Sequence, residues 1–510
     1  MSIITVNPLF ELIVWTIQAS RKVTFELIWD LFIHAPQYYE YWWTNLLRDA
    51  PLHVFIETSL ILFILWLTFI RRTVDPGKSS NNTKLTQKEV DWLLETWQPE
   101  PLVPELSTAE KFIIDNCPLI EGFTQEGDAL LVRGVSEPVI DCCSFDFLGM
   151  SQDATVKKVT KDALDYYGCG SCGPRGFYGT IDQHLNFELA IAKFMGTQEA
   201  ISYSDGASAL SSAIPAFSKK GDLLIVDESV SEPILTGLNL SRSTVQFFKH
   251  NDVVDLRSIL EAIAEDDVNK RRDSTQQRRF IVVEGLYRNE GDICPLPEIL
   301  ALKEEFCYRM ILDESLSFGT LGASGRGVTE HFGIETSDVE IVLLAMDTAL
   351  ASIGGVCVGS REIVDHQRLS GAGYCFSASA PPFLSAAAIA ALTKLEKEPQ
   401  MLVHLNDRVQ ILYGALKSIP LLQHKSTLPT PVMHLVFETP LASVNDEAMA
   451  MLEIAKLCLQ GGVAVTASKF AIMKGLRPSL VVCASTKLTD MQIKKIAHVI
   501  GSSVRSHLKV

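Results

Sequence analysis

The chain has 510 residues, of which 47% are hydrophobic and 21% are charged, and this length exceeds what one ordinary hydrophobic core can hold. It contains 45 Lys and Arg and 61 Asp and Glu, for a net charge of −16, which argues against a basic face for nucleic acid. Its 11 cysteines are odd in number and do not resemble a disulfide framework. We therefore expect a reducing compartment, and a membrane-associated part followed by a two-domain globular part.

A long apolar stretch near the N-terminus has the length of a membrane span. Leu52–Ile70 holds one acid, Glu57, and lies between Pro51 and the pair Arg71 and Arg72. At a rise of roughly 1.5 Å per residue, its helix would reach about 28 Å, which is enough for a bilayer core. We predict a transmembrane helix over residues 52–70, with the following chain in the cytosol by the positive-inside rule. A buried core helix is the alternative, and the long uncharged run before paired arginines disfavours it.

Residues 1–51 mix apolar and charged side chains and contain a group of aromatic residues. We expect one or two helices of Leu9–Ile33 to lie in the membrane interface, with the aromatics of Tyr38–Trp43 at headgroup level. A second spanning helix is an open alternative. Residues 71–110 are expected to form a cytosolic linker and an amphipathic helix, Thr86–Trp97.

From residue 111 onward, strands and helices alternate at the spacing of βαβ units. This spacing predicts an α/β fold with a largely parallel sheet and helices on both faces. Four apolar runs are the expected central strands: Leu223–Val226, Phe280–Val283, Met310–Leu312 and Ile341–Leu344. We assign residues 111–390 to this large domain and residues 391–510 to a smaller C-terminal α+β domain. The smaller domain is expected to hold strands near Val432–Phe437, Val463–Ala467 and Leu480–Cys483, with a closing helix after Thr489.

Cys169 and Cys172 have the spacing of half a zinc site or of a redox pair. No second pair follows, and the surrounding segment is rich in glycine. We therefore expect no metal site.

Five segments, in order, resemble the α-oxoamine synthase family of pyridoxal-phosphate (PLP) enzymes. They are SFDFLGM (Ser144–Met150), GCGSCGPRGFYGTIDQHLNFELAIAKFMG (Gly168–Gly196), ILDESLSFGTLGASGRG (Ile311–Gly327), IVLLAMDTALASIGGVCVGS (Ile341–Ser360) and YCFSASAPP (Tyr374–Pro382). One such match is weak, but five in the right order are not expected by chance. The resemblance implies a fold-type I aminotransferase-like architecture.

The departures from the family pattern fall on cofactor contacts. The register places Thr348 where the family has the lysine that holds PLP, and a threonine hydroxyl cannot form a Schiff base. Two family histidines are Leu316 and Ser231 here, whereas Asp313 keeps the carboxylate that faces the pyridine nitrogen. We therefore expect these four residues to form a vestigial cofactor pocket, and no catalytic residue in this chain.

Active members of the family are dimers with the site at the interface, so the resemblance implies that this chain completes the site of a partner subunit. That partner would carry PLP on its own lysine. The implied reaction condenses L-serine with palmitoyl-CoA to 3-ketodihydrosphingosine, the first step of sphingolipid synthesis. The residues expected to reach the partner's site are Cys172, Gly173, Pro174, Phe145, Asp146, Phe147, Ser377 and Ser379.

The resemblance also implies a location and further partners. It places the chain in the endoplasmic reticulum membrane, among membrane lipids and with its globular part in the cytosol, and it adds a small activating subunit and Orm-type regulators. We expect Arg175 to serve an interface ion pair or a phosphate, and His184 to be a satisfied structural histidine. Two rivals stay open, namely an independently active acyltransferase and a membrane scaffold that does not touch the partner's site.

Overall fold

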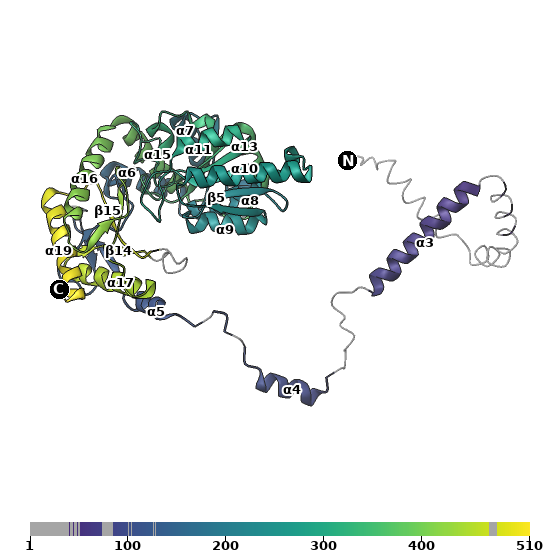
Figure 1. Ribbon diagram of the computed structural model, residues 1–510, viewed down its shortest axis with the longest axis horizontal. Helices are drawn as coiled ribbons and strands as arrows, with labels where there is room; N and C mark the ends of the chain where they lie inside the picture. The colour runs from purple at the N-terminus through teal and green to yellow at the C-terminus, as the bar shows by residue number, and fades with distance from the viewer. Residues whose placement is uncertain are drawn as a thin grey trace, which may run out of the picture. The chain divides into compact units, whose positions relative to one another are not determined.

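The computed structural model describes residues 51–73, 85–99, 101–103, 105–125, 127, 129–468 and 477–509, together with Glu40, Thr44 and Arg48. The chain divides into two compact units, Met1–Pro104 and Glu105–Val510, and each is described by itself (Figure 1). The helices predicted in Leu9–Ile33 and the aromatic residues of Tyr38–Trp43 lie outside the described residues. The domain boundary predicted at residue 390 stays a prediction.

The first unit contains α3 (Pro51–Thr73) and α4 (Gln87–Thr96). The helix predicted at residues 52–70 is present as α3. However, none of the helices in the described part of the chain is both long and apolar enough to cross a membrane. The amphipathic helix predicted at Thr86–Trp97 is confirmed as α4. Its first turn is capped, because the Thr86 hydroxyl accepts from the backbone N–H of Glu89 and the Glu89 carboxylate accepts from the backbone N–H of Thr86.

The second unit is organised around a seven-stranded sheet with the order β4-β10-β9-β8-β7-β5-β6. Its strands are β4 (Glu199–Tyr203), β5 (Leu223–Asp227), β6 (Thr244–Phe248), β7 (Arg279–Glu284), β8 (Arg309–Asp313), β9 (Ile341–Ala345) and β10 (Gly355–Gly359). The four predicted central strands are confirmed as β5, β7, β8 and β9, which pair in parallel with one another. β5, β7 and β9 bury every side chain, as expected for a sheet covered on both faces.

The sheet is largely parallel, as predicted, but it is mixed, because β10 runs against the other strands. β10 pairs antiparallel with both β9 and β4. The segment between β9 and β10, residues 346–354, is too short for the helical crossover that a parallel pair needs. It ends at Gly354, whose φ of +150° is rarely adopted by a residue with a side chain.

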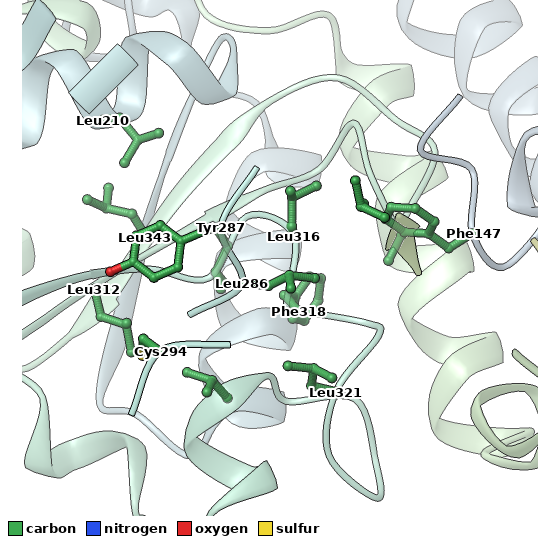
Figure 2. Packing of buried hydrophobic residues seen from close by; sticks show 14 of the residues in the cluster. Phe147, Leu210, Leu286, Tyr287, Cys294, Leu312, Leu316, Phe318, Leu321 and Leu343 are labelled. Carbon is green, nitrogen blue, oxygen red and sulfur yellow. The ribbon is translucent and has the colours of Figure 1, made fainter. Parts of the chain in front are cut away.

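Helices surround this sheet (Figure 1). They are α6 (Ala154–Tyr167), α7 (Asp182–Met195), α8 (Gly206–Phe217), α9 (Glu232–Ser241), α10 (Val253–Lys270), α11 (Leu296–Glu305), α12 (Val328–His331), α13 (Arg361–Ser370), α14 (Ala372–Cys375) and α15 (Pro382–Lys397). Figure 2 shows part of the core that they enclose, including Tyr287 and two residues of the central strands, Leu312 and Leu343. All three side chains are fully buried.

The C-terminal segment forms a second, antiparallel sheet with the order β11-β12-β15-β14. Its elements are β11 (Leu422–His424), β12 (Val432–Phe437), β14 (Thr466–Ala467) and β15 (Leu480–Cys483), with the helices α16 (Gln400–Lys417), α17 (Val444–Gln460) and α19 (Asp490–Leu508). The strands predicted here and the closing helix are confirmed. α5 (Thr108–Asp115), β1 (Ile120–Phe123), β2 (Leu130–Val132) and β3 (Ile140–Asp141) precede the large sheet, and β13 (Val463–Ala464) pairs in parallel with β3.

Candidate functional site

The vestigial pocket lies at the carboxyl ends of the central strands. Asp313 ends β8 and Thr348 follows β9, and together with Leu316 and Ser231 they line one cavity of about 110 Å³. Parallel strands deliver such residues to a common edge of the sheet. The structure therefore brings together all four residues that the sequence assigned to the pocket.

Thr348 is held by the backbone around it. Its hydroxyl donates to the carbonyl oxygen of Ser315 at 2.8 Å, and that of Ala345 lies 3.4 Å away. The side chain is 2% exposed. The position that carries a reactive amine in the family thus carries a hydroxyl whose proton is already used in a structural bond.

Two buried carboxyl groups stand side by side at the floor of the vestigial pocket, because Glu284 and Asp313 are paired residues on β7 and β8. Burial, together with the charge of Asp313, raises the pKa of Glu284 to about 8. Burial also raises the pKa of Asp313, although the N–H of Ser315 donates to its Oδ1 at 2.8 Å. The sequence analysis missed Glu284, although its place at the end of a predicted apolar strand was a usable signal.

The N-terminus of α8 opens on the same cavity through Gly206, and a helix N-terminus is a natural phosphate site. Here the carboxylate of Asp205 caps the helix and accepts from the N–H of Ser208 at 2.7 Å and from its hydroxyl at 2.6 Å. Asp347 lies beside this turn, since a Cβ placed on Gly206 would be 3.7 Å from Asp347 Oδ1. Two carboxylates would repel a phosphate dianion, and Thr348 offers no amine. These residues do not fit PLP.

A larger cavity of about 660 Å³ adjoins the vestigial pocket and shares wall residues with it, including Ser231 and Arg288. We call this cavity the outer chamber. Phe145 lines it, with the guanidinium of Arg288 4.7 Å from the ring centroid. The predicted trio of residues 145–147 is thus divided, because Phe147 is fully buried in the core and Asp146 accepts from Lys487 Nζ at 2.9 Å. No hydrogen bond among the described residues joins this trio to the Cys172 loop.

The Cys172 loop and the Ser379 segment form one structure, which we call the loop clasp (residues 171–180 and 376–380). The Ser379 hydroxyl donates to Ser171 Oγ at 2.7 Å and contacts the carbonyl oxygens of Gly173 and Gly179, while its backbone N–H donates to Gly173 at 2.9 Å. The predicted residues Cys172, Gly173, Pro174, Ser377 and Ser379 therefore lie together. Their contribution to a partner's site stays a prediction.

A buried ion pair joins the loop clasp to α7. Arg175 donates through two nitrogens to the Glu188 carboxylate, at 2.8 and 3.1 Å, and also to Ser202 Oγ at 2.7 Å. The side chains of Arg175 and Glu188 are 5% and 8% exposed. The expectation that Arg175 would serve an interface or a phosphate is therefore wrong, because its charge is satisfied inside this chain.

His184 at the start of α7 is a structural histidine, as expected. Its Nδ1 accepts from the N–H of Ile181 at 3.1 Å, and its Nε2 donates to the carbonyl oxygen of Ala380 at 2.7 Å. Burial lowers the pKa of His184. The neutral ring thus ties α7 to the loop clasp.

The outer surface of the loop clasp exposes large apolar side chains. Phe177 is 69% exposed, Phe376 86% and Tyr178 fully exposed. Tyr178 and Cys172 also have positive φ values, +66° and +60°, a conformation that costs a non-glycine residue about 1–3 kcal/mol and is found at functional sites. The fold therefore holds an apolar, strained surface where the sequence places residues for a partner.

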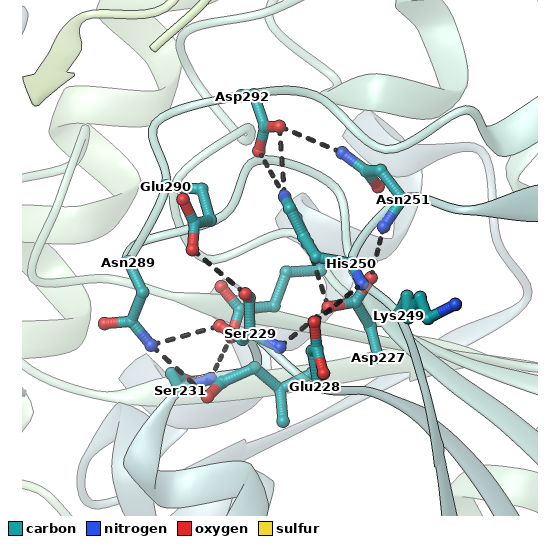
Figure 3. Close-up of polar contacts among 12 residues, drawn as sticks. Asp227, Glu228, Ser229, Ser231, Lys249, His250, Asn251, Asn289, Glu290 and Asp292 are labelled. Atoms are coloured by element: carbon teal, nitrogen blue, oxygen red, sulfur yellow. Dashed lines mark hydrogen bonds and ion pairs between the residues drawn. The ribbon is translucent and has the colours of Figure 1, made fainter. Parts of the chain in front are cut away.

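A charged network lies at the carboxyl end of β5, and Figure 3 shows His250 between Asp227 and Asp292. Nδ1 of the ring is 2.9 Å from Asp227 Oδ1, and Nε2 is 3.0 Å from Asp292 Oδ2. Burial opposes the charge on this ring, but the two carboxylates outweigh it and raise the pKa of His250 to about 10. The sequence analysis did not find this network, because its members are far apart in the chain.

We expect the replacement His250→Asn to destabilise the protein most at low pH. A folded-state pKa near 10 against about 6.5 in the unfolded chain means that the stabilisation is complete below pH 6.5 and is lost as the pH rises through 10. The melting temperature should therefore differ most from that of the wild type at pH 6, and the difference should shrink toward pH 10. His498→Asn, on the exposed face of α19, is the matched control. A pH-independent difference for His250→Asn would contradict the expectation.

Comparison with known proteins shows the family of this chain. Residues 137–500 match the family model of aminotransferase class I and II. The chain therefore belongs to the aminotransferase class I and II family.

More specifically, the chain is similar to two curated relatives. It is 42% identical over 418 residues to Long chain base biosynthesis protein 1c of Oryza sativa subsp. japonica, covering 82% of this chain and 83% of the relative. It is 39% identical over 460 residues to Serine palmitoyltransferase 1 of Dictyostelium discoideum, and the match covers 88% of this chain and 93% of that relative. The solved structure of Sphingomonas wittichii serine palmitoyltransferase superposes with a TM-score of 0.69 at 25% identity, covering 83% of this chain and 97% of that one.

Proposed function

We propose that this chain is the non-catalytic subunit of a heteromeric serine palmitoyltransferase. The assembled enzyme would condense L-serine with palmitoyl-CoA, releasing carbon dioxide, coenzyme A and 3-ketodihydrosphingosine. The observation that carries the proposal is Thr348 in the lysine position, with its hydroxyl bonded to the backbone. Asp205 and Asp347 support the same conclusion, because they place negative charge at the N-terminus of α8, where the phosphate of PLP would lie. PLP, which supplies the electron sink for such a condensation, would be bound by the partner subunit.

The loop clasp is the surface through which this chain would act on its partner. Its backbone is held by Ser379 and supported by the Arg175–Glu188 pair, so it can present a fixed shape at low entropic cost. Its exposed aromatic residues Phe177 and Tyr178 belong to the residue types that dominate binding energy at interfaces. Cys172, Gly173 and Pro174 would then border the partner's substrate site.

We further propose that the chain works at the endoplasmic reticulum membrane, with residues 105–510 in the cytosol. The apolar face of α3 supports an association with lipid, since Phe55, Ile61 and Phe63 are each more than half exposed. Palmitoyl-CoA and the product are amphiphiles, which gives a reason for this location. A small activating subunit and Orm-type regulators would bind the same N-terminal region.

Affinity capture of this chain from detergent-solubilised membranes, followed by a PLP assay of each captured subunit, tests the proposal. We expect a homologous subunit to co-purify and to carry all of the PLP that borohydride fixes to protein. Expression of this chain by itself is the control, and we expect it neither to fix PLP nor to condense serine with palmitoyl-CoA. Fixed PLP or turnover in that control would instead support an independently active acyltransferase.

A further inference from the structure

The vestigial pocket and the outer chamber adjoin across shared wall residues, Ser231 and Arg288 among them, and they differ in chemistry. The outer chamber is lined largely by apolar groups, among them Phe145, Pro233, Val432 and Val481, and its volume of about 660 Å³ is typical of small-molecule sites. The vestigial pocket, by contrast, is lined by the acids Glu284, Asp313 and Asp347. A ligand that fills both must therefore be apolar at one end and polar at the other.

Three acids and one cation, Arg288, line the acidic end, so its charges do not balance. Asp313 is 5% exposed, and Ser315 donates to its carboxylate through its backbone N–H and its side chain. Neither Asp313 nor Asp347 forms an ion pair with a described cation. Arg288 acts on the charge of Asp313 from a distance, and its guanidinium lies over the ring of Phe145. Buried carboxylates in excess of their cations are costly, so this end favours a cation from outside the chain.

We propose that the two cavities together bind a primary amine that carries an alkyl chain, with the ammonium group on Asp313 and Asp347 and the chain in the outer chamber. An ammonium group has three donors and forms charge-assisted bonds with both carboxylates. An amphiphile with a carboxylate or phosphate head would meet the acids instead and be repelled. The product of the proposed reaction is a long-chain primary amine. Feedback by that product rests on the proposed function, whereas the binding itself does not.

Isothermal titration of the full-length chain with n-octylamine tests the inference, with n-octanol as the neutral analogue. We expect octylamine to bind at least about tenfold more tightly than octanol, because a hydrogen bond to a charged group contributes that much or more. Across hexylamine, heptylamine and octylamine, affinity should rise about threefold to fourfold per methylene. Equal binding of octylamine and octanol, or no binding of octylamine, would overturn the proposal.

Two variants and a control locate the two ends of the ligand. Asp313→Asn keeps an acceptor for the N–H of Ser315 and removes the charge, and it should weaken octylamine binding at least about tenfold. Asp162→Asn, on the exposed face of α6, should leave it unchanged. Thr236→Trp, at an exposed position that lines the outer chamber, would fill that chamber and should abolish the gain in affinity per methylene of the alkylamine. If Asp313→Asn behaves as the Asp162 control, or if Thr236→Trp keeps the gain, the proposed pose is wrong.

Discussion

Arg175→Met is expected to lower the free energy of unfolding by about 3–5 kcal/mol, because it leaves the charge of Glu188 buried and unpaired. The Glu188 side chain is 8% exposed, and among the described residues only the N–H and hydroxyl of Ser202, each 2.8 Å away, would remain to stabilise its carboxylate. Methionine keeps much of the apolar volume of the arginine side chain, so the loss reports the charge rather than a cavity. Urea unfolding followed by far-ultraviolet circular dichroism measures the effect.

Two controls separate a buried ion pair from a generic loss of arginine. Arg133 and Glu121 form a pair at 2.7 Å with side chains 67% and 52% exposed, and Arg133→Met should cost less than about 1 kcal/mol. The double variant Arg175→Met, Glu188→Met removes both buried charges and should be more stable than the sum of the two single changes implies. A loss for Arg175→Met as small as that for Arg133→Met would contradict the account.

Gly179→Ala is expected to reduce capture of the partner subunit by more than about tenfold, equivalent to about 1.4 kcal/mol of binding free energy. A Cβ at position 179 would lie 1.9 Å from the carbonyl oxygen of Gly173 and 2.6 Å from that of Pro174. Both are backbone atoms, so the loop clasp must open to accommodate the methyl group. Opening would also break the contact between Ser379 and the Gly179 carbonyl and displace the exposed aromatic surface.

Gly176→Ala is the matched control, because it lies in the same loop and a Cβ there would have no atom within 4 Å. We expect this variant to capture the partner as the wild type does. Quantified co-purification measures the binding, and limited proteolysis of the loop reports whether the clasp has opened. If Gly179→Ala opens the clasp without loss of capture, the loop clasp is not the partner surface.

The residues of the vestigial pocket could be predicted from the sequence. Thr348, Leu316, Ser231 and Asp313 were assigned from motif register, and the structure places them in one cavity. The end of the pocket at the N-terminus of α8, where a phosphate would lie, could not be assigned in this way, because Asp205 and Asp347 are 142 positions apart (347 − 205) and both lie near this turn only in the folded chain. Arg175 was misread because its partner Glu188, although only 13 residues away, lies on a different element, α7.

By itself, the sequence determined the central strands and the loss of the cofactor lysine, because apolar runs and motif spacing are local properties of a chain. Only the tertiary structure decided that the sheet is mixed, that Arg175 is neutralised internally, and that Ser379 closes onto the Cys172 loop. It also decided that the empty lysine position borders an acidic pocket with an apolar chamber beside it. These features depend on groups that different elements bring together, and burial there sets the strength of each charge and hydrogen bond.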